Sequence, residues 1–577
     1  MQVAVHQDDA DILLKQRNIL DESIVEKYRV AGQITQTGLQ YLTSLINNSY
    51  HLQVGPKFTI QQLCLLTDSF LMGLLAKAYA HKVNEKGIAS PTTINVNELL
   101  NGFAPEIDDE RDFFLKEGDV ATLSLGVQID GYTSQVSHTL VIYPPSPTEL
   151  KPSGPLLGNN ADALCATHVA VEATIALLGC ALAPEKVPQP LKTGSNAITG
   201  AQIRELVDSI AEQFNCVVVP GSKVRRIRRF LAGQAEGIVA ERDFKGVVWD
   251  ESHQEAQLLK RTSAKSTSTS NSTELQAHDG RSKPVGTSNS SAVPSDEFVV
   301  FPGEVYQVDL RMSGLNTGEQ PQQQLGIVTT EEVDHFTGKN YKQNDFNAKA
   351  SIFVRDFAIV HQLKLKTARK LLGEIDKSFS VFPFKLDFAS KSFPINIESS
   401  EEEIKESIEK IKEELKSFRL GSAELINRHL VQSKPIQITK FVALKEILSS
   451  ANPTGKHGID ANKPVLPGME IPLPQLGISS LKLKSLLKTG ANISNVRESS
   501  TILLNQDKNE VYRLTGGEST AKMSWVHSQY KLSHELFQVV NHLVQLTKDT
   551  RFGIKVKEVG PYKMKQQNLV VESMQVD

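Results

Sequence analysis

The stretch from residue 121 to residue 142, ATLSLGVQIDGYTSQVSHTLVI, constrains the fold of this 577-residue chain more than any other. Leu123, Leu125 and Val127 alternate with small or polar residues, which is the period-two pattern of a strand with one distinct apolar face. An Asp-Gly pair then divides the stretch, and this pair favours the tight turn of a β-hairpin. The sequence therefore predicts two antiparallel strands joined at that turn.

Two similar groups of elements surround this hairpin. Apolar residues at helical spacing predict two helices before it and two after it, and each helix pair is followed by a strand. Such a repeated order indicates an internal duplication and the α/β (α+β) fold class. The predicted elements are helices at 23–46, 60–83, 159–182 and 199–214 and strands within 86–106 and at 216–220.

The hairpin resembles that of the methionine aminopeptidases. In that family it reads roughly D-x-G-x-x-x-x-G-x-x-x-D, and both aspartates bind catalytic metals; Ser124 and Gln135 occupy these positions here. The segment 86–106 is similar to the family stretch G-x-A-F-P-T…N-x-x-x-x-H, whose substrate-contacting histidine corresponds to Gly102. The resemblance implies the pita-bread fold of the type 2 enzymes, in which two pseudo-symmetric halves enclose a cleft.

Three more metal-ligand positions of the family can be placed in this chain. The segment FVVFPGEVYQVDL resembles the family strand G-E-V-Y-A-x-[ED], whose acid corresponds to Asp309. RESSTILL resembles the last family strand and puts Ser499 at the position of a glutamate. The metal-binding histidine corresponds to Leu231, just after KVRRIRRF. The resemblance thus leaves a carboxylate at only one of five ligand positions.

This loss bears directly on activity. A two-metal hydrolase uses anionic oxygen ligands to hold two divalent cations about 3.5–4 Å apart and to activate a shared water. Hydroxyl and amide side chains are neutral and cannot offset the charge of the metals. We therefore expect no bound metal, no cofactor and no catalytic residues, and an active metalloaminopeptidase is the least favoured function.

Insertions divide the predicted core. Residues 251–297 are dominated by Ser, Thr, Asn, Gln and Lys, a composition that buries too little apolar surface to offset the entropy of ordering, so we expect a disordered insertion. The predicted units are a lead-in (1–22), the first part of the core (23–250), this insertion, the second part of the core (298–345), the helical and irregular insertion of type 2 members (346–495), the final core strand (496–510) and a C-terminal extension (511–577).

The segment HQLKLKTARKLLGEIDKSFSVFPFKLD, residues 361–387, identifies a branch of the family. It closely resembles a segment of the proliferation-associated, ErbB3-binding proteins, which have the fold without the peptidase activity. The insertions, the extended C-terminus and the lost ligands are most similar to another member of this inactive branch, the fungal nuclear export factors of large ribosomal subunit precursors.

The resemblance to this branch implies a non-enzymatic ribosome biogenesis factor. Such a protein would bind the pre-60S subunit near the polypeptide exit tunnel and contact rRNA, exit-tunnel ribosomal proteins and other assembly factors. It would assist nuclear export by contact with Phe-Gly nucleoporins, and so shuttle between nucleus and cytoplasm. Its cleft, without metals, could still accept an extended peptide or protein tail.

Contact with rRNA would require local basic patches, because the formal net charge of the chain is −3. KVRRIRRF is one candidate, since guanidinium groups suit phosphate oxygens and apolar residues are interleaved; the alternative is a solvated helix or loop face. The candidate residues are Lys223, Arg225, Arg226, Arg228, Arg229, Lys364, Lys366, Arg369, Lys370, Lys482, Lys484 and Lys488.

Residues 401–420 predict a helix with an apolar seam at spacings of four and three. Ser400 and Glu403 form a capping box at its start. The seam spans under three heptads, so packing on its own domain is favoured over a dimer zipper or a partner-docking helix, and we expect a monomer.

The remaining composition favours a reducing compartment without membrane association. The four cysteines stand singly in apolar stretches, which predicts buried free thiols. We see no signal peptide and no run of 18 apolar residues, so no membrane span is expected. A histone- or peptide-binding scaffold is the alternative function, and the lack of long acidic tracts argues against histones.

Overall fold

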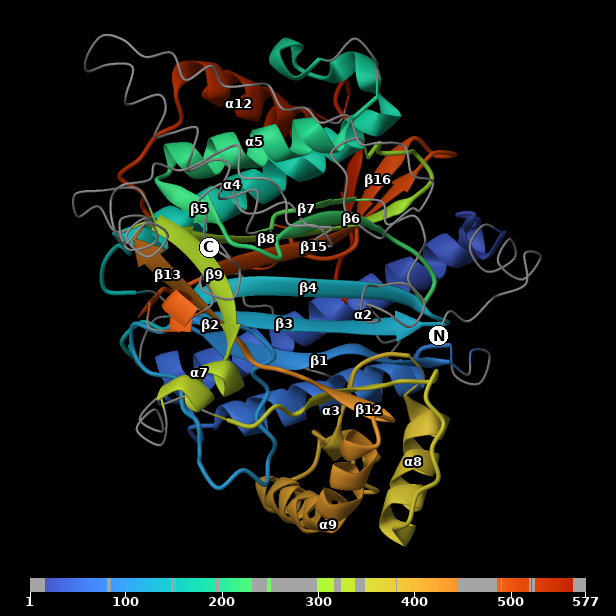
Figure 1. Cartoon of the computed structure of the whole chain (residues 1–577). Coiled ribbons are helices and arrows are strands. Elements are labelled where there is room, and N and C mark those ends of the chain that lie inside the picture. The colour runs from blue at the N-terminus through green and yellow to red at the C-terminus, as the bar shows by residue number, and fades with distance from the viewer. Residues whose placement is uncertain are drawn as a thin grey trace, which may run out of the picture.

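The computed structural model is built around one large sheet (Figure 1). Its central strands follow the order β1-β3-β4-β15-β8-β6-β7, and β5, β16 and β17 join from the sides. The structure describes residues 16–79, 83, 85–146, 150, 152–192, 197–230, 246–250, 298–315, 323–337, 348–379, 381–443, 485–488, 490–517, 520, 525–549 and 551–563. The predicted insertion 251–297 and position Leu231 lie outside these residues.

The first half of the sheet confirms the predicted hairpin. β3 and β4 pair in antiparallel register, and Asp130 and Gly131 turn between them with φ of 55° and 78°, as a type I′ turn requires. A capping box at Thr59 starts α3, which ends at Lys77, earlier than predicted, because the backbone is extended at Ala78 (ψ 129°) and left-handed at Tyr79 (φ 54°). The elements are α2 (Glu22–Ile46), α3 (Ile60–Lys77), β1 (Lys86–Val96), β2 (Leu99–Asn101), β3 (Val120–Ile129) and β4 (Tyr132–Val141).

The second half repeats this arrangement. α2 and α3 pack on β1, β3 and β4, while α4 contacts β8 and β15 and α5 contacts β5 and β7. β4 and β15 are neighbours, so β1-β3-β4 is followed across the sheet by its counterpart β15-β8-β6, which gives two pseudo-symmetric halves. The elements are α4 (Asn159–Gly179), α5 (Gly200–Gln213), β5 (Cys216–Val218), β6 (Lys223–Ile227), β7 (Gly246–Val248), β8 (Val305–Gly314) and β15 (Val496–Asn505).

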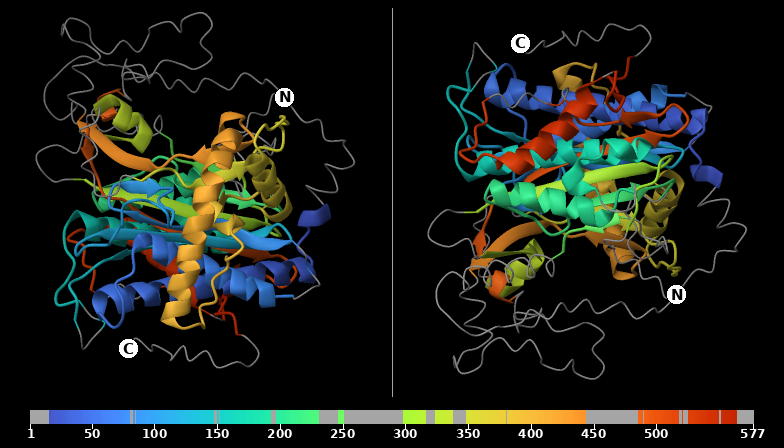
Figure 2. Two further views of the ribbon diagram at one scale, coloured as in Figure 1. Left: turned by 90° about the horizontal axis from the view of Figure 1, so that it is seen from below. Right: turned by 90° about the horizontal axis from the view of Figure 1, so that it is seen from above.

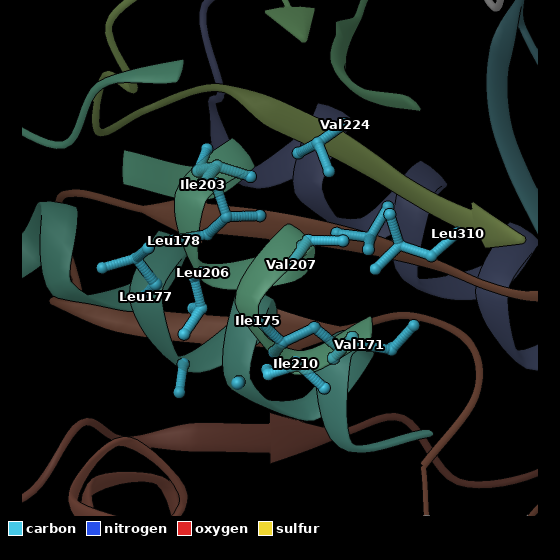
Figure 3. Close-up of a cluster of buried hydrophobic side chains, with 14 of the residues drawn as sticks. Val171, Ile175, Leu177, Leu178, Ile203, Leu206, Val207, Ile210, Val224 and Leu310 are labelled. Carbon is cyan, nitrogen blue, oxygen red and sulfur yellow. The ribbon is translucent and has the colours of Figure 1, made fainter. Parts of the chain in front are cut away.

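The core of the second half explains the unusual composition of α4. Figure 3 shows Val171 and Ile175 of α4 among Val207 and Ile210 of α5 in one buried apolar cluster. By length and composition, Asn159–Leu182 is apolar enough to cross a membrane, but 78% of its most apolar window is buried inside the protein. Packing against the sheet therefore accounts for its apolar surface.

The segment 346–495, predicted as helical and irregular, also contributes strands. β10, β11 and β12 form a small sheet beside α8 and α9. The capping box at Ser400 is confirmed, and Ile408, Ile411 and Leu415 of the α9 seam are buried in this unit, so α9 packs on its own domain. The elements are β10 (Ile352–Arg355), α8 (Lys366–Ser378), β11 (Phe384–Lys385), α9 (Glu401–Asn427) and β12 (Val431–Lys434).

A third sheet forms a wall opposite the centre of the large sheet. Its strand β13 pairs with β2, β9 and β14, and the chain just before β13 passes close to Gly102, where φ is 86°. A side chain at that glycine would approach the Pro435 carbonyl to 3.1 Å. The elements are β9 (Gln323–Thr329), α7 (Thr330–Thr337), β13 (Gln437–Ala443) and β14 (Ala491–Asn492).

The described part of the C-terminal extension belongs to the second half. β16 pairs with β15, β17 runs parallel to β16, and Val540 and Leu543 of α12 join the core around α4. α12 begins after the N-cap at Ser533. α12 and α9 lie at opposite ends of the molecule (Figures 1 and 2). The elements are β16 (Glu510–Arg513), α12 (His534–Lys548) and β17 (Val556–Glu558).

Candidate functional site

The fold brings together four of the five predicted ligand positions. Ser124 on β3 lies opposite Ser137 on β4, and their hydroxyl oxygens are 2.8 Å apart. Ser499 on β15 is the register partner of both Ser137 and Asp309, which joins the two halves at the centre of the sheet. Gln135 accepts a hydrogen bond at its Oε1 from the Gln307 amide at 2.9 Å. The alignment of these positions is therefore spatially coherent.

Asp309, the one remaining carboxylate, is fully buried and held by arginines. Arg497 donates to both of its oxygens, from Nε to Oδ1 at 2.7 Å and from Nη2 to Oδ2 at 2.9 Å. Arg311 donates to Oδ2 at 3.2 Å. Burial alone would raise the pKa of Asp309, but the guanidinium charges of Arg311 and Arg497 hold that pKa well below its ordinary value.

One lysine and one arginine of the predicted basic run also lie at this site. Lys223 on β6 is the register partner of Asp309, and Arg225 is the partner of Gln307. The charge of Arg225, together with burial, lowers the pKa of Lys223 to about 7, and Asp309 opposes this effect. A basic cluster, which we define as Lys223, Arg225, Arg311 and Arg497, thus surrounds one carboxylate.

Sequence reasoning missed two members of this basic cluster. Arg311 lies two residues after Asp309 on β8, and Arg497 lies two residues before Ser499 on β15. Alternate residues of a strand point to the same face of a sheet, so the period-two pattern carried the signal. Glu498, between them, faces away and accepts a hydrogen bond from the Thr139 amide at 3.0 Å.

The basic cluster lines a cleft between the large sheet and the wall that carries β13. The cleft has a volume of about 520 Å³, and Gly102 and Pro435 lie on the wall side. Among the described residues that line it, Asp309 is the only acid, whereas Lys434 adds a fifth cation. The polar lining includes Ser90, Thr93, Asn101, Ser124, Gln135, Ser137, Gln307, Gln432, Ser433 and Gln437.

The residues present do not fit a two-metal centre. Within the part of the chain that the structure describes, no group of three or more His, Cys, Asp or Glu side chains could hold a metal ion. The oxygens of Asp309 are already engaged by Arg497 and Arg311. A divalent cation at this point would also be repelled by the surrounding positive charges.

The rest of the predicted basic run lies on β6 or just after it, not on the solvated helix or loop face that was the alternative. Arg226 and Arg228 donate to Glu304 at 3.3 and 2.7 Å. Arg229 donates to Asp130 at the hairpin turn at 2.6 Å. The five basic residues of the run therefore divide between the cleft and two carboxylates. Their contact with rRNA stays a prediction.

The other predicted basic residues are placed differently. Lys364, Lys366, Arg369 and Lys370 are all exposed at the start of α8, and we call them the α8 basic patch. The Lys364 amide donates to Glu424 of α9, which fixes this turn against its neighbour. Lys482 and Lys484 lie outside the described residues. The Lys488 carbonyl accepts from Lys440 at 3.1 Å.

Comparison with known proteins places the chain in a family. It is 71% identical over 577 residues to the probable metalloprotease ARX1 of Candida albicans, with all of both chains covered. It is 48% identical over 598 residues to that of Saccharomyces cerevisiae, with 98% of each covered. The chain belongs to the ARX1 family. No protein-family model matches it.

The solved structure of a thermophilic Arx1 shares the fold of this ARX1-family chain. The TM-score is 0.51 at 17% sequence identity, and the match covers 90% of this chain and 98% of that one. The methionine aminopeptidase-like, pita-bread architecture predicted from the hairpin is thereby confirmed. ARX1 relatives are named probable metalloproteases, whereas in this chain a basic cluster surrounds Asp309 beside the predicted ligand positions.

Proposed function

We propose that this ARX1-family chain is a non-enzymatic ribosome biogenesis factor. It binds the pre-60S subunit near the polypeptide exit tunnel, contacts rRNA, ribosomal proteins and other assembly factors there, and assists nuclear export through Phe-Gly nucleoporins. It shuttles between nucleus and cytoplasm. The proposal is supported by the resemblance of residues 361–387 to the inactive branch of the family and by membership of the ARX1 family.

The observation that carries the RNA contact is the α8 basic patch. The chain has a formal net charge of −3, so binding to a phosphate backbone requires cations gathered on one surface. Ala368, Leu371 and Ile375 bury the other face of α8 against α9 and the small sheet, so the helix presents the patch on a packed support. Four exposed cations within seven residues suit positioning contacts to phosphates.

The non-enzymatic part of the proposal follows from the cleft. The chemistry of a metallopeptidase starts with a water polarised by metal ions. In this chain Arg497 binds the only carboxylate among the predicted ligands, at 2.7 and 2.9 Å. Since Ser124, Gln135 and Ser499 offer only neutral oxygens, the cleft is a binding site and not a hydrolytic one.

The test is cosedimentation of the purified protein with large ribosomal subunits from about 50 mM to about 200 mM salt. The variant replaces Lys364, Lys366, Arg369 and Lys370 together by Gln. The matched control makes the same change of net charge on the neighbouring helix, as K405Q/K410Q/K412Q/K416Q. These four lysines lie on α9, where Lys410 pairs with Glu406 and Lys412 with Glu409 at the surface.

We expect the unmodified protein to bind and its affinity to fall steeply with salt. Each lost phosphate contact reduces the slope of log affinity against log salt by roughly 0.7–0.9, so the α8 variant should lose up to about 3–4 of that slope. The α9 control should keep it. Equal losses of slope in both variants would show that the α8 basic patch is not part of the interface. No binding at low salt would overturn the ribosome proposal.

A further inference from the structure

The described lining of the cleft holds more cations than carboxylates. There are five cations, Lys223, Arg225, Arg311, Lys434 and Arg497, and a single carboxylate, that of Asp309, in this lining. Arg311 and Arg497 are direct register partners on β8 and β15, although like charges opposite each other destabilise a sheet. An anion bound beside Asp309 would reduce this repulsion.

The polar atoms around the basic cluster are suited to an anion. Arg311 and Arg225 are buried in the wall of the cleft, where the low dielectric strengthens a charge-assisted hydrogen bond. The Nε of Arg311 and the Oγ of Ser499 are buried without a hydrogen-bond partner in the structure. Lys223 lines the same cleft from β6, and its ammonium group forms no hydrogen bond within the described residues.

The dimensions of the cleft indicate the kind of anion. Its volume of about 520 Å³ matches that of a small-ligand pocket and is too small for an RNA duplex, whose backbone would have to enter between two sheets. Strands bound the cleft on both sides, and polar side chains such as Gln135, Gln307 and Gln432 line it. An extended peptide segment of a few residues suits this volume and the polar lining.

We propose that this cleft binds the carboxylate of an extended peptide, with the basic cluster as its receptor. The carboxylate is either the free C-terminus of the peptide or an acidic side chain. The guanidinium group of Arg311 and the ammonium group of Lys223 recognise it. The site therefore uses the position of the lost metals, with the sign of the bound charge reversed. This inference goes beyond the proposed function and does not depend on ribosome binding.

The test uses the full chain and three fluorescein-labelled hexapeptides of Gly and Gln, measured by fluorescence anisotropy. The first has a free C-terminal carboxylate and no acidic side chain. The second has an amidated C-terminus and one central Glu. The third is amidated and has Gln in place of that Glu, so it carries no carboxylate. A short single-stranded oligouridylate is a fourth probe, which tests a phosphate backbone as the ligand instead.

We expect the first or the second peptide to bind at least tenfold more tightly than the third, because a buried hydrogen bond to a charged group distinguishes the carboxylate from the amide. The tighter of the two identifies the source of the carboxylate. K223Q should lower the affinity for that peptide by about tenfold or more. K405Q, which removes an exposed lysine of α9 that does not line the cleft, should leave its affinity unchanged.

A second variant is expected to bind more tightly, and tighter binding cannot result from misfolding. D309N removes the carboxylate that competes for Arg497 and Arg311, so it should raise the affinity for the carboxylate peptide. Equal affinity for all three peptides, an unchanged affinity in K223Q, or no binding of either carboxylate peptide would overturn the proposal. Tighter, K223Q-sensitive binding of the oligouridylate would overturn it in favour of a nucleic-acid strand.

Discussion

Replacing Asp309 by Asn removes the only negative charge from the described lining of the cleft while it keeps the shape of the side chain. Asp309 is fully buried, and its carboxylate accepts two hydrogen bonds from Arg497 and one from Arg311. The Asn amide offers one acceptor oxygen and turns its nitrogen toward a guanidinium group. The arginines would then be left facing each other without a compensating charge.

The magnitude follows from the burial of these groups. Removing one partner of a buried ion pair is destabilising by about 3–5 kcal/mol, because the remaining charge is buried without compensation. Three charge-assisted hydrogen bonds at 2.7, 2.9 and 3.2 Å are affected, which agrees with the upper part of this range. For a cooperative unit of about 150–250 residues, each kcal/mol lowers Tm by about 2–4 °C, so we expect Tm to fall by roughly 6 °C or more.

Differential scanning calorimetry measures this change, with D376N as the matched control. Asp376 also accepts a hydrogen bond from an arginine, Arg355, at 2.7 Å, but its side chain is 40% exposed. Exposed ion pairs contribute about 0–1 kcal/mol, so D376N should shift Tm by only a degree or two. Two variants with the same chemical change thus separate the effect of burial from the effect of the substitution.

A Tm for D309N within about one degree of the unmodified protein would refute this reasoning, since the arginines would then not depend on the carboxylate. A double-mutant cycle of D309N and R497M should give a coupling free energy of about 0.5–3 kcal/mol, because Asp309 and Arg497 share two hydrogen bonds. The pKa of Asp309 is lowered by folding. The stability it contributes is therefore present above about pH 3.8 and is lost only as the pH falls below that value.

Two further predictions concern pH and metals. Burial lowers the pKa of His51 from 6.5 to about 4, so in acid the unfolded chain binds a proton that the folded chain does not. The free energy of unfolding should therefore fall by about 1.5 kcal/mol between pH 6.5 and pH 5. In H51F this fall in the free energy of unfolding, measured by denaturant titration, should be smaller by that amount, and an equal fall would contradict the assignment. Added Mn²⁺ or Co²⁺ should shift Tm by less than about 1 °C, whereas a metal at a hundred times its Kd would stabilise by about 2.7 kcal/mol.

Local patterns in the sequence determined the elements and much of the site. The Asp-Gly turn and the period-two alternation specified the hairpin of β3 and β4, since both signals act between neighbouring residues. Capping boxes at Thr59 and Ser400 mark the starts of α3 and α9, and each depends on a residue only three positions further along the chain. The resemblance of the hairpin located Ser124 and Gln135, and Asp309 and Ser499 followed from two later strands. That four residues from four strands would meet was implied by the family and not by the sequence alone.

The tertiary structure decided how the charges of the site are arranged. Arg311 and Arg497 come from strands nearly two hundred residues apart, and only their pairing in the sheet sets both against Asp309. The run KVRRIRRF is continuous in sequence, yet the pleat of β6 and the carboxylates of Glu304 and Asp130 divide its charges between the cleft and two ion pairs. The amino-acid sequence specifies the sign of the charge on each side chain. The electrostatic field in the cleft, however, depends on strand register and on ion-pair partners far along the chain.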